Sequence, residues 1–469
     1  MMLERIFTPG LAQVAYLVAD DSTGEAALID PRSDIDGYLK RLDDCGLRLV
    51  AVLETHVHAD FVSGARELND ATGATICAPV PSTDGDTDRR RLLGDGDEVA
   101  IGQLCLRALW TPGHTPEHLA YLLRDPCNGS TPVALFSGDA LFVGEVGRPD
   151  LLESEQTRAL AASLYRTVVD RLVRLPDDLI VYPGHTAGSA CGKRIGDAPS
   201  TTIGDERLLN YAFQARSEES FVEMVLNGMP APSSYYPIVK QINAGGPPLL
   251  RDLRAGMPLG PSDIAAHQAM GALVIDSRSP AAFGAGHIPS AVFAGLGPTF
   301  TAWVGWLAPY ERNLVLVLDR DDRFDEASTE LRRIGLDRVA GYLAGGMTAW
   351  LAAGQPVDTL AQISVEDLAH DLAGPSGALT VLDVRSGDEW NDRRISGAVH
   401  HFAGSIAQGV NPPIDPAARI AVICGSGYRS SVAASLLADR GYRHLINVKG
   451  GITARRAADL PVAAGAAGR

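Results

Sequence analysis

The sequence predicts a multidomain α/β protein built from three units. Its 469 residues, 46% of them hydrophobic, exceed the size of one ordinary domain. Short β-rich runs alternate with helical patterns in the first part of the chain, and a repeat of about a hundred residues follows, which is too long a period for a solenoid. We therefore expect domains at residues 1–212, 261–356 and 357–469, with a wrapping linker at 213–260.

The first unit shows a mixed α/β pattern. In its clearest predicted helix, Leu160, Leu164, Val168 and Leu172 recur at every fourth position and would form one buried stripe. The predicted strands are the β-rich runs at residues 26–30, 49–54, 104–110, 133–137 and 179–182.

The segment 213–260 has a weaker pattern. Proline and glycine are frequent in it, as in MPAP (229–232) and GGPP (245–248). Such a composition is typical of loops, so we expect a linker rather than a packed core.

The last two units are duplicates of one another. Apolar runs at 314–318 and 420–423 each lead into a loop and a predicted helix, which is the pattern of a parallel sheet. Three motif pairs carry the repeat: VIDSR (274–278) with VLDVR (381–385), HIPSAV (287–292) with RISGAV (394–399), and GGMTA (345–349) with GGITA (450–454).

Composition excludes several classes of protein. A net charge of −16 disfavours contact with a nucleic-acid backbone, and no apolar run reaches the ~18 residues of a membrane helix. No signal-peptide pattern opens the chain, and six scattered cysteines form no disulfide framework. We expect a cytoplasmic protein without nucleic-acid or membrane partners, and a homo-oligomer.

Candidate metal ligands follow four of the predicted strands in the first unit. Imidazole and carboxylate are ligands for metals such as zinc and iron, and strand ends are where open α/β folds place their ligands. The sequence therefore predicts a metal site. The candidates are His56, His58 and Asp60 after the first of these strands, His114 in a Pro-Gly-His turn, Asp139 in a Gly-Asp turn, and His185 in a second Pro-Gly-His turn.

This array resembles the metallo-β-lactamase superfamily, whose motif is His-x-His-x-Asp-His followed by later His, Asp and His ligands. The resemblance implies an αββα sandwich. Phe61 stands where the two-metal hydrolases of the superfamily have the last histidine of the motif. A phenyl ring cannot coordinate, so the second metal position loses a ligand.

The stretches TPGHTPEH (111–118) and GRPD (147–150) look like those of the persulfide dioxygenase branch. That resemblance implies one Fe(II) per chain, held by His56, His114 and Asp139, which is the ligand set of non-haem Fe(II) oxygenases. It also implies that Arg148 binds the thiol carrier of the persulfide. We expect His58, Asp60 and His185 to orient the ligands rather than touch iron. For His58, direct binding of the metal stays an open alternative.

The last unit carries a candidate nucleophile in the loop CGSGYRS (424–430). Backbone N–H groups at a helix start, together with Arg429, favour a thiolate at Cys424. The loop resembles that of the rhodaneses, whose cysteine carries a sulfane sulfur, with Arg429 stabilising the bound anion. In the middle repeat Asp319 replaces this cysteine. A carboxylate cannot carry sulfur, so we expect no transferase activity there.

Together these resemblances imply a fused persulfide dioxygenase–sulfurtransferase of bacterial sulfide detoxification. It would oxidise a low-molecular-weight thiol persulfide with O2 to sulfite, and sulfur transfer would give thiosulfate. Two alternatives stay open: a glyoxalase II-like zinc thioester hydrolase fused to a sulfurtransferase, and a sulfur carrier with a vestigial metal domain. The sequence leaves the thiol carrier and the direction of sulfur flow undetermined.

Overall fold

A computed structural model describes most of the chain, which divides into two compact units. The first comprises Met1–Leu253 with Leu331–Gly335, and the second comprises Arg254–Glu330 with Leu336–Arg469. The described residues are 1–80, 90–129, 131–151, 154–229, 231–374 and 379–464.

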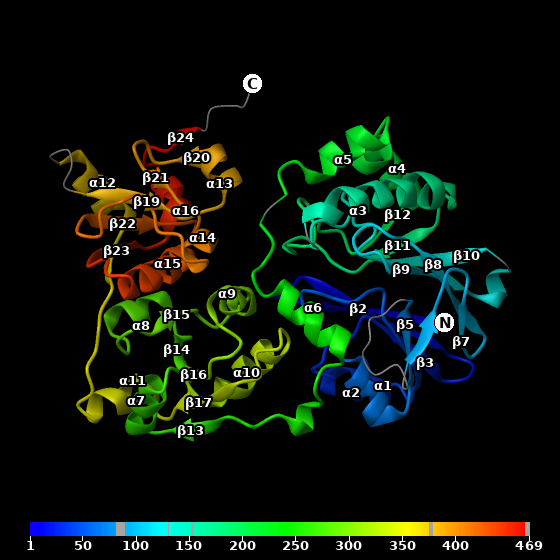
Figure 1. Cartoon of the computed structure of the whole chain (residues 1–469), viewed down its shortest axis with the longest axis horizontal. Helices are drawn as coiled ribbons and strands as arrows, with labels where there is room; N and C mark the ends of the chain where they lie inside the picture. The colour runs from blue at the N-terminus through cyan, green and yellow to red at the C-terminus, as the bar shows by residue number, and fades with distance from the viewer. Residues whose placement is uncertain (81–89, 130, 152–153, 230, 375–378, 465–469) are drawn as a thin grey trace. The chain divides into compact units, whose positions relative to one another are not determined.

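Two mixed sheets form the centre of the first unit (Figure 1). In spatial order the first sheet contains β1 (Met2–Thr8), β2 (Gln13–Asp20), β3 (Glu25–Ile29), β4 (Arg48–Leu53), β5 (Thr75–Pro79) and β6 (Arg90–Leu93). The second contains β12 (Thr201–Thr202), β11 (Ile180–Pro183), β10 (Pro132–Gly138), β9 (Leu119–Arg124), β8 (Leu104–Trp110) and β7 (Glu98–Ile101).

Helices cover the outer face of each sheet, so the first unit is an αββα sandwich, as expected. Strand β2 illustrates this layered arrangement, because the residues on both of its faces are buried. Val14, Tyr16 and Val18 face the other sheet, whereas the alternate residues pack toward α1 and α2. The helices of this unit are α1 (Asp36–Asp44), α2 (Ala65–Thr72), α3 (Ser154–Arg166), α4 (Ile203–Leu209), α5 (Glu218–Leu226) and α6 (Tyr236–Gly245).

The strands predicted in this unit are confirmed to within one residue at each end as β3, β4, β8, β10 and β11. The apolar stripe from Leu160 to Leu172 is also buried. Only part of it is α-helical, because α3 ends at Arg166 and a π-helical turn follows at Thr167–Arg171.

The segment 213–260 differs from the expected linker. It contains α5, whose Phe221 and Val225 belong to the core over the second sheet, and α6, whose Tyr236 and Val239 are buried. The expectation that this segment lacks packed structure is therefore wrong. The prolines and glycines at 229–232 and 245–248 indicated a loop, although Phe221, Val222 and Val225 recur at helical spacing in α5. The domain boundaries stay predictions.

The second unit contains two parallel sheets with the same strand order, which confirms the duplication (Figure 1). The middle repeat has β13 (Met257–Leu259), β17 (Val339–Leu343), β16 (Leu314–Val317), β14 (Leu273–Asp276) and β15 (Val292–Phe293). The last repeat has β18 (Ala361–Ile363), β23 (His444–Val448), β22 (Arg419–Ile423), β19 (Thr380–Asp383) and β21 (Val399–His400). Beside it, β20 (Arg393–Arg394) pairs with β24 (Ala463–Ala464).

Helices flank both sheets of the second unit. Those of the middle repeat are α7 (Pro261–Ala269), α8 (Pro280–Ala285), α9 (Phe300–Leu307), α10 (Phe324–Arg332) and α11 (Gly346–Ala352). Those of the last repeat are α12 (Val365–Ala373), α13 (Gly387–Asp392), α14 (Ala403–Ala407), α15 (Tyr428–Asp439) and α16 (Gly451–Ala457). Over the described part of the chain, every helix is too short or too polar to cross a membrane.

Candidate metal centre and thiol site

The first unit brings together the three predicted iron ligands. His56 follows β4, His114 follows β8 and Asp139 follows β10, so both sheets contribute. One ligand atom from each lies within 4.8 Å of the other two, and all three side chains are buried. The strand-end positions therefore converge on one group that could hold a metal ion.

Hydrogen bonds to the protein turn one ring nitrogen of each histidine toward this group. The Nδ1 of His114 donates to the Arg148 carbonyl at 2.8 Å, which leaves its Nε2 3.5 Å from Asp139 Oδ2. Thr55 Oγ1 donates to Asp30 and accepts from His56 Nδ1 at 2.9 Å, so His56 Nε2 is also free. Burial lowers the pKa of both histidines, which keeps them neutral as metal ligands must be.

Asp139 leaves one buried oxygen without a partner among the described residues. Its Oδ1 accepts from His185 Nδ1 at 2.8 Å, whereas its Oδ2 has no hydrogen bond. Burial alone would raise the pKa of this carboxyl, but the charge and hydrogen bond of His185 hold it below the usual range. An ionised, buried and unpaired oxygen between two imidazole nitrogens fits a cation.

His185 lies between two carboxylates, Asp139 on one side and Asp60 on the other. Its Nε2 is 2.7 Å from Asp60 Oδ2, so both ring nitrogens are engaged. Although burial lowers the pKa of His185, the two carboxylates raise it well above its usual value. The close approach needs Gly184, because a Cβ there would lie 2.7 Å from Asp139 Oδ1.

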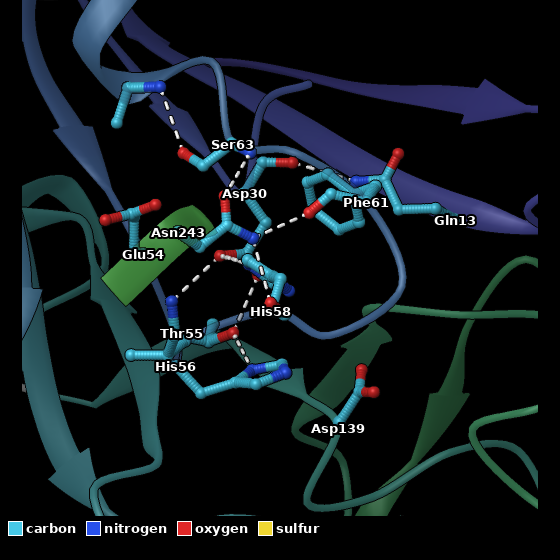
Figure 2. A network of polar contacts seen from close by, with 12 residues as sticks. Gln13, Asp30, Glu54, Thr55, His56, His58, Phe61, Ser63, Asp139 and Asn243 are labelled. Atoms are coloured by element: carbon cyan, nitrogen blue, oxygen red, sulfur yellow. Dashed lines mark hydrogen bonds and ion pairs between the residues drawn. The ribbon is translucent and has the colours of Figure 1, made fainter. Parts of the chain in front are cut away.

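His58 lies beside the triad: its ring centroid is 4.2 Å from that of His56, and its buried Nδ1 has no hydrogen bond among the described residues. Its Nε2 is 2.9 Å from Asp30 Oδ1, and its ring packs against Phe61 with centroids 4.3 Å apart (Figure 2). Burial lowers the pKa of His58, but Asp30 more than offsets this and raises it to about 8. The same Asp30 binds the Thr55 backbone and hydroxyl, so it joins His58 to the support of His56.

Asn243 of α6 fastens the loop that carries these residues. Its side-chain amide donates to the carbonyls of His58 at 2.8 Å and Phe61 at 2.7 Å, and its oxygen accepts from Ser63 N at 2.9 Å (Figure 2). Residues of the supposed linker therefore shape the metal loop.

Arg148 is buried and already paired. Its guanidinium binds both oxygens of Asp150, at 2.7 and 2.8 Å, and the carbonyl of Ala190 at 2.9 Å. In this geometry a carboxylate of the carrier would have to displace Asp150. The proposed contact with substrate stays a prediction, whereas the backbone of Arg148 orients His114.

Cys191 lies against the other side of the site. It forms a second compact group with Asp60 and His185, within 4.8 Å and fully buried. Burial raises the pKa of its thiol to about 12, although His185 lowers it, so this sulfur is held as a thiol.

The last repeat places Cys424 between β22 and α15. Its Sγ accepts from Gly427 N at 3.1 Å and lies 3.4 Å from Ser430 Oγ. Arg429 binds both oxygens of Glu389, at 2.5 and 2.7 Å. Burial lowers the pKa of Arg429, but Glu389 and Cys424 more than offset this and raise it above the usual value.

In the middle repeat Leu318, and not Asp319 as expected, stands at the position of Cys424, because the sheet register aligns Val317 with Ile423. A leucine side chain cannot carry sulfur either.

The loop that follows Leu318 has its charges paired internally. Arg323 lies 3.5 Å from Asp319 and 2.8 Å from Glu326, and Arg320 lies 3.0 Å from Asp322. These contacts offset the positive charge that an anionic ligand would need.

Sequence reasoning missed three supporting residues: Asp30, Asn243 and Glu389. Asp30 had a usable signal, because it ends the predicted strand next to the one that precedes His56. Asn243 and Glu389 had none, since each meets its partner only through tertiary packing.

Comparisons with known proteins agree with this architecture. Residues 8–185 match the metallo-beta-lactamase superfamily, and residues 261–353 and 364–458 match the rhodanese-like domain. A metallo-beta-lactamase structure from Staphylococcus aureus is 32% identical and covers 73% of this chain and 98% of that one, with a TM-score of 0.66. This chain therefore belongs to the metallo-beta-lactamase superfamily, with two rhodanese-like domains after its metallo-beta-lactamase domain.

Two kinds of relative match the first domain. The mitochondrial persulfide dioxygenase ETHE1 of Homo sapiens is 30% identical over 236 residues, which cover 50% of this chain and 84% of that protein. A hydroxyacylglutathione hydrolase of Polaromonas is 36% identical over 187 residues, which cover 39% of this chain and 66% of that protein.

Proposed function

We propose that the first domain is a non-haem Fe(II) persulfide dioxygenase and that the last domain transfers sulfur through Cys424. The observation that carries the proposal is the buried group His56, His114 and Asp139 with its unpaired carboxylate oxygen. Two imidazoles and one carboxylate are the ligands of iron oxygenases, and they leave positions open for substrate and O2. When bound, Fe(II) supplies the activation of O2 that side chains cannot provide.

The protein's own residues hold and orient this group. Thr55 and the Arg148 carbonyl fix the ring orientations of His56 and His114, and His185 holds Asp139 by its Oδ1. The substrate is a thiol persulfide, which reacts with O2 and water to give sulfite and the free thiol. At Cys424, a bound sulfane sulfur then passes to sulfite, and thiosulfate leaves with the cysteine restored as thiolate.

Oxygen uptake on addition of glutathione persulfide tests the proposal. We expect uptake by anaerobically iron-loaded protein with about one iron per chain. Asp139→Ala should lose iron and oxygen uptake together but keep thiosulfate:cyanide sulfur transfer. Cys424→Ser should lose thiosulfate:cyanide sulfur transfer but keep iron and oxygen uptake. Iron content unaffected by Asp139→Ala would refute the ligand assignment.

The hydrolase relatives favour a second candidate, a zinc thioester hydrolase. This activity uses a metal-bound water, usually between two zinc ions. Two features count against a second zinc ion: Phe61 cannot supply a ligand, and both ring nitrogens of His185 are already bound by carboxylates. Two zinc ions per chain together with thioester turnover would place this candidate first.

A further inference from the structure

Tyr428 belongs to the Cys424 loop but contacts the other repeat. Its hydroxyl donates to the Gly295 carbonyl at 2.9 Å, and its ring packs against Phe293 with centroids 5.3 Å apart. Burial raises the pKa of Tyr428, so the hydroxyl keeps the proton that it donates. The residues on either side of it are Gly427, whose N–H reaches Cys424 Sγ, and Arg429.

The contact is part of a continuous core. Phe283 and Phe293 of the middle repeat belong to the same buried cluster as Val432 and Leu437 of α15. The Phe293 N–H also donates to Ser435 Oγ at 3.1 Å, which places β15 beside α15 (Figure 1). The start of α15 is therefore fixed by residues of both repeats.

The close packing around Gly295 leaves no room for a side chain at this position. A Cβ there would lie 3.2 Å from Tyr428 Cε2, 3.0 Å from Phe293 Cζ and 2.9 Å from the Arg278 carbonyl. Two residues further on, a Cβ on Gly297 would meet nothing within 4 Å. Of these two glycines, Gly295 is the one at which a side chain would push against Tyr428 and the Cys424 loop.

Duplication alone does not account for the contact between Tyr428 and Gly295, because the residues at the equivalent positions, with the two repeats exchanged, are of other types. The hydrogen bonds from Ala294 to Asp276 and from Leu296 to Ser277 correspond to those from His401 to Asp383 and from Ala403 to Val384. Gly295 thus corresponds to Phe402. Because the sheet register aligns Val317 with Ile423, Tyr428 corresponds to Asp322, which pairs with Arg320 of its own repeat.

We propose that the Cys-less repeat positions the Cys424 loop by holding Tyr428 through the Gly295 carbonyl and the Phe293 ring. Tyr428 is a positioning residue: it fixes the first turn of α15, so that the Gly427 N–H and Arg429 face the sulfur. This inference rests on the sulfur transfer proposed for Cys424. It gives the repeat without a cysteine a direct part in the chemistry of its neighbour.

Tyr428→Phe in the full chain tests the inference, because it removes only the hydroxyl. We expect kcat/KM for thiosulfate:cyanide transfer to fall about fivefold, the effect of one hydrogen bond. The rate of alkylation of Cys424 by iodoacetamide, followed on its own peptide by mass spectrometry, should fall similarly, with its pH midpoint moved upward. The matched control is Tyr442→Phe, a buried tyrosine of the same repeat whose hydroxyl binds Pro412 instead.

A second pair of variants acts from the Cys-less repeat. Gly295→Ala should slow both reactions of Cys424, whereas Gly297→Ala should leave them unchanged. The inference is overturned if Tyr428→Phe stays within twofold of the wild-type protein in both reactions, or lowers only the melting temperature. If the wild-type protein transfers no sulfur but Tyr428→Phe still slows alkylation, the positioning role stands and the proposed transferase function fails.

Discussion

The two rhodanese-like repeats share a scaffold and differ in one loop. In both, a buried aspartate at a strand end binds the arginine two residues later: Asp276 with Arg278 and Asp383 with Arg385. After the central strand, however, one repeat has Cys424 and the other has Leu318 at the same position. The comparison teaches that the residues maintaining this fold are separate from those that could carry sulfur, so one can persist without the other.

The largest expected effect lies at the position where the repeats differ. Cys424→Ser should abolish thiosulfate:cyanide transfer, by at least about a thousandfold, because a hydroxyl does not accept a sulfane sulfur. Asp319→Ala, in the loop of the other repeat, should change transfer by less than about twofold, since exposed pairs contribute little. A loss of transfer in Asp319→Ala comparable to that in Cys424→Ser would break the comparison.

The shared scaffold should respond equally in both repeats. Asp276 and Asp383 are fully buried, and each accepts from the backbone and the guanidinium of its arginine. Asp276→Asn and Asp383→Asn should each lower the free energy of local opening by about 3 kcal/mol, because a buried charge loses its partner. Hydrogen exchange of the β14 and β19 peptides measures this. Asp388→Asn, on an exposed position, is the control, and a loss confined to one repeat would contradict the expectation.

Arg429 should matter more than its counterpart Arg323. Its planar fork binds both oxygens of Glu389 beside Cys424, which the ammonium of lysine cannot reproduce. We expect Arg429→Lys to lower kcat/KM for sulfur transfer about tenfold, the value of one charge-assisted hydrogen bond. Arg323→Lys should have less than about a twofold effect. Equal effects would show that Arg429 acts only on folding.

The smallest effect is a dependence of stability on pH. Burial raises the pKa of Glu389, but Arg429 and Ser386 more than offset this and hold it at about 2. Because the folded-state pKa is below the ordinary one, the pair stabilises the fold at neutral pH. This contribution is lost as the pH falls from the ordinary carboxyl range toward 2.

Thermal unfolding across this range should show a shallower acid slope for Glu389→Gln than for the wild-type protein. Asp319→Asn in the other loop should leave the slope unchanged, because its contact with Arg323 is 3.5 Å long and half exposed. An unchanged slope in Glu389→Gln would mean that the pair has the same protonation in the unfolded chain.

Local sequence patterns predicted most of the fold, because the apolar runs before His56, His114, Asp139 and Cys424 have the length and period of strands. They also predicted which strand ends carry ligands. The convergence of the strand-end ligands was foreseeable because open α/β folds place their ligands at strand ends, whereas the choice of His56, His114 and Asp139 among them came from the resemblance. The αββα arrangement itself came from resemblance, since periodicity does not reveal how two sheets face one another.

What the sequence concealed depends on contacts between distant segments. Helix α6 was taken as linker because it lies between the proline- and glycine-rich stretches at 229–232 and 245–248, which hide its buried residues Tyr236 and Val239. The contact between Tyr428 and Gly295 joins residues 133 positions apart, and neither residue type signals it. The burial of Arg148 was not predictable either, since arginine is usually exposed and its pairing with Asp150 becomes visible only in the structure.

The bonds from Asn243 to the metal loop also set an order of events during synthesis. Ser63 and Asn243 are 180 residues apart, so the ribosome makes the loop long before the amide that fastens it. At about 5–20 residues per second, the interval is on the order of ten to forty seconds. Throughout that time the nascent chain carries His56 and His58 on a loop that lacks three of its hydrogen bonds. Final closure of the metal loop therefore belongs to a late stage of translation, after both sheets of the sandwich have been made.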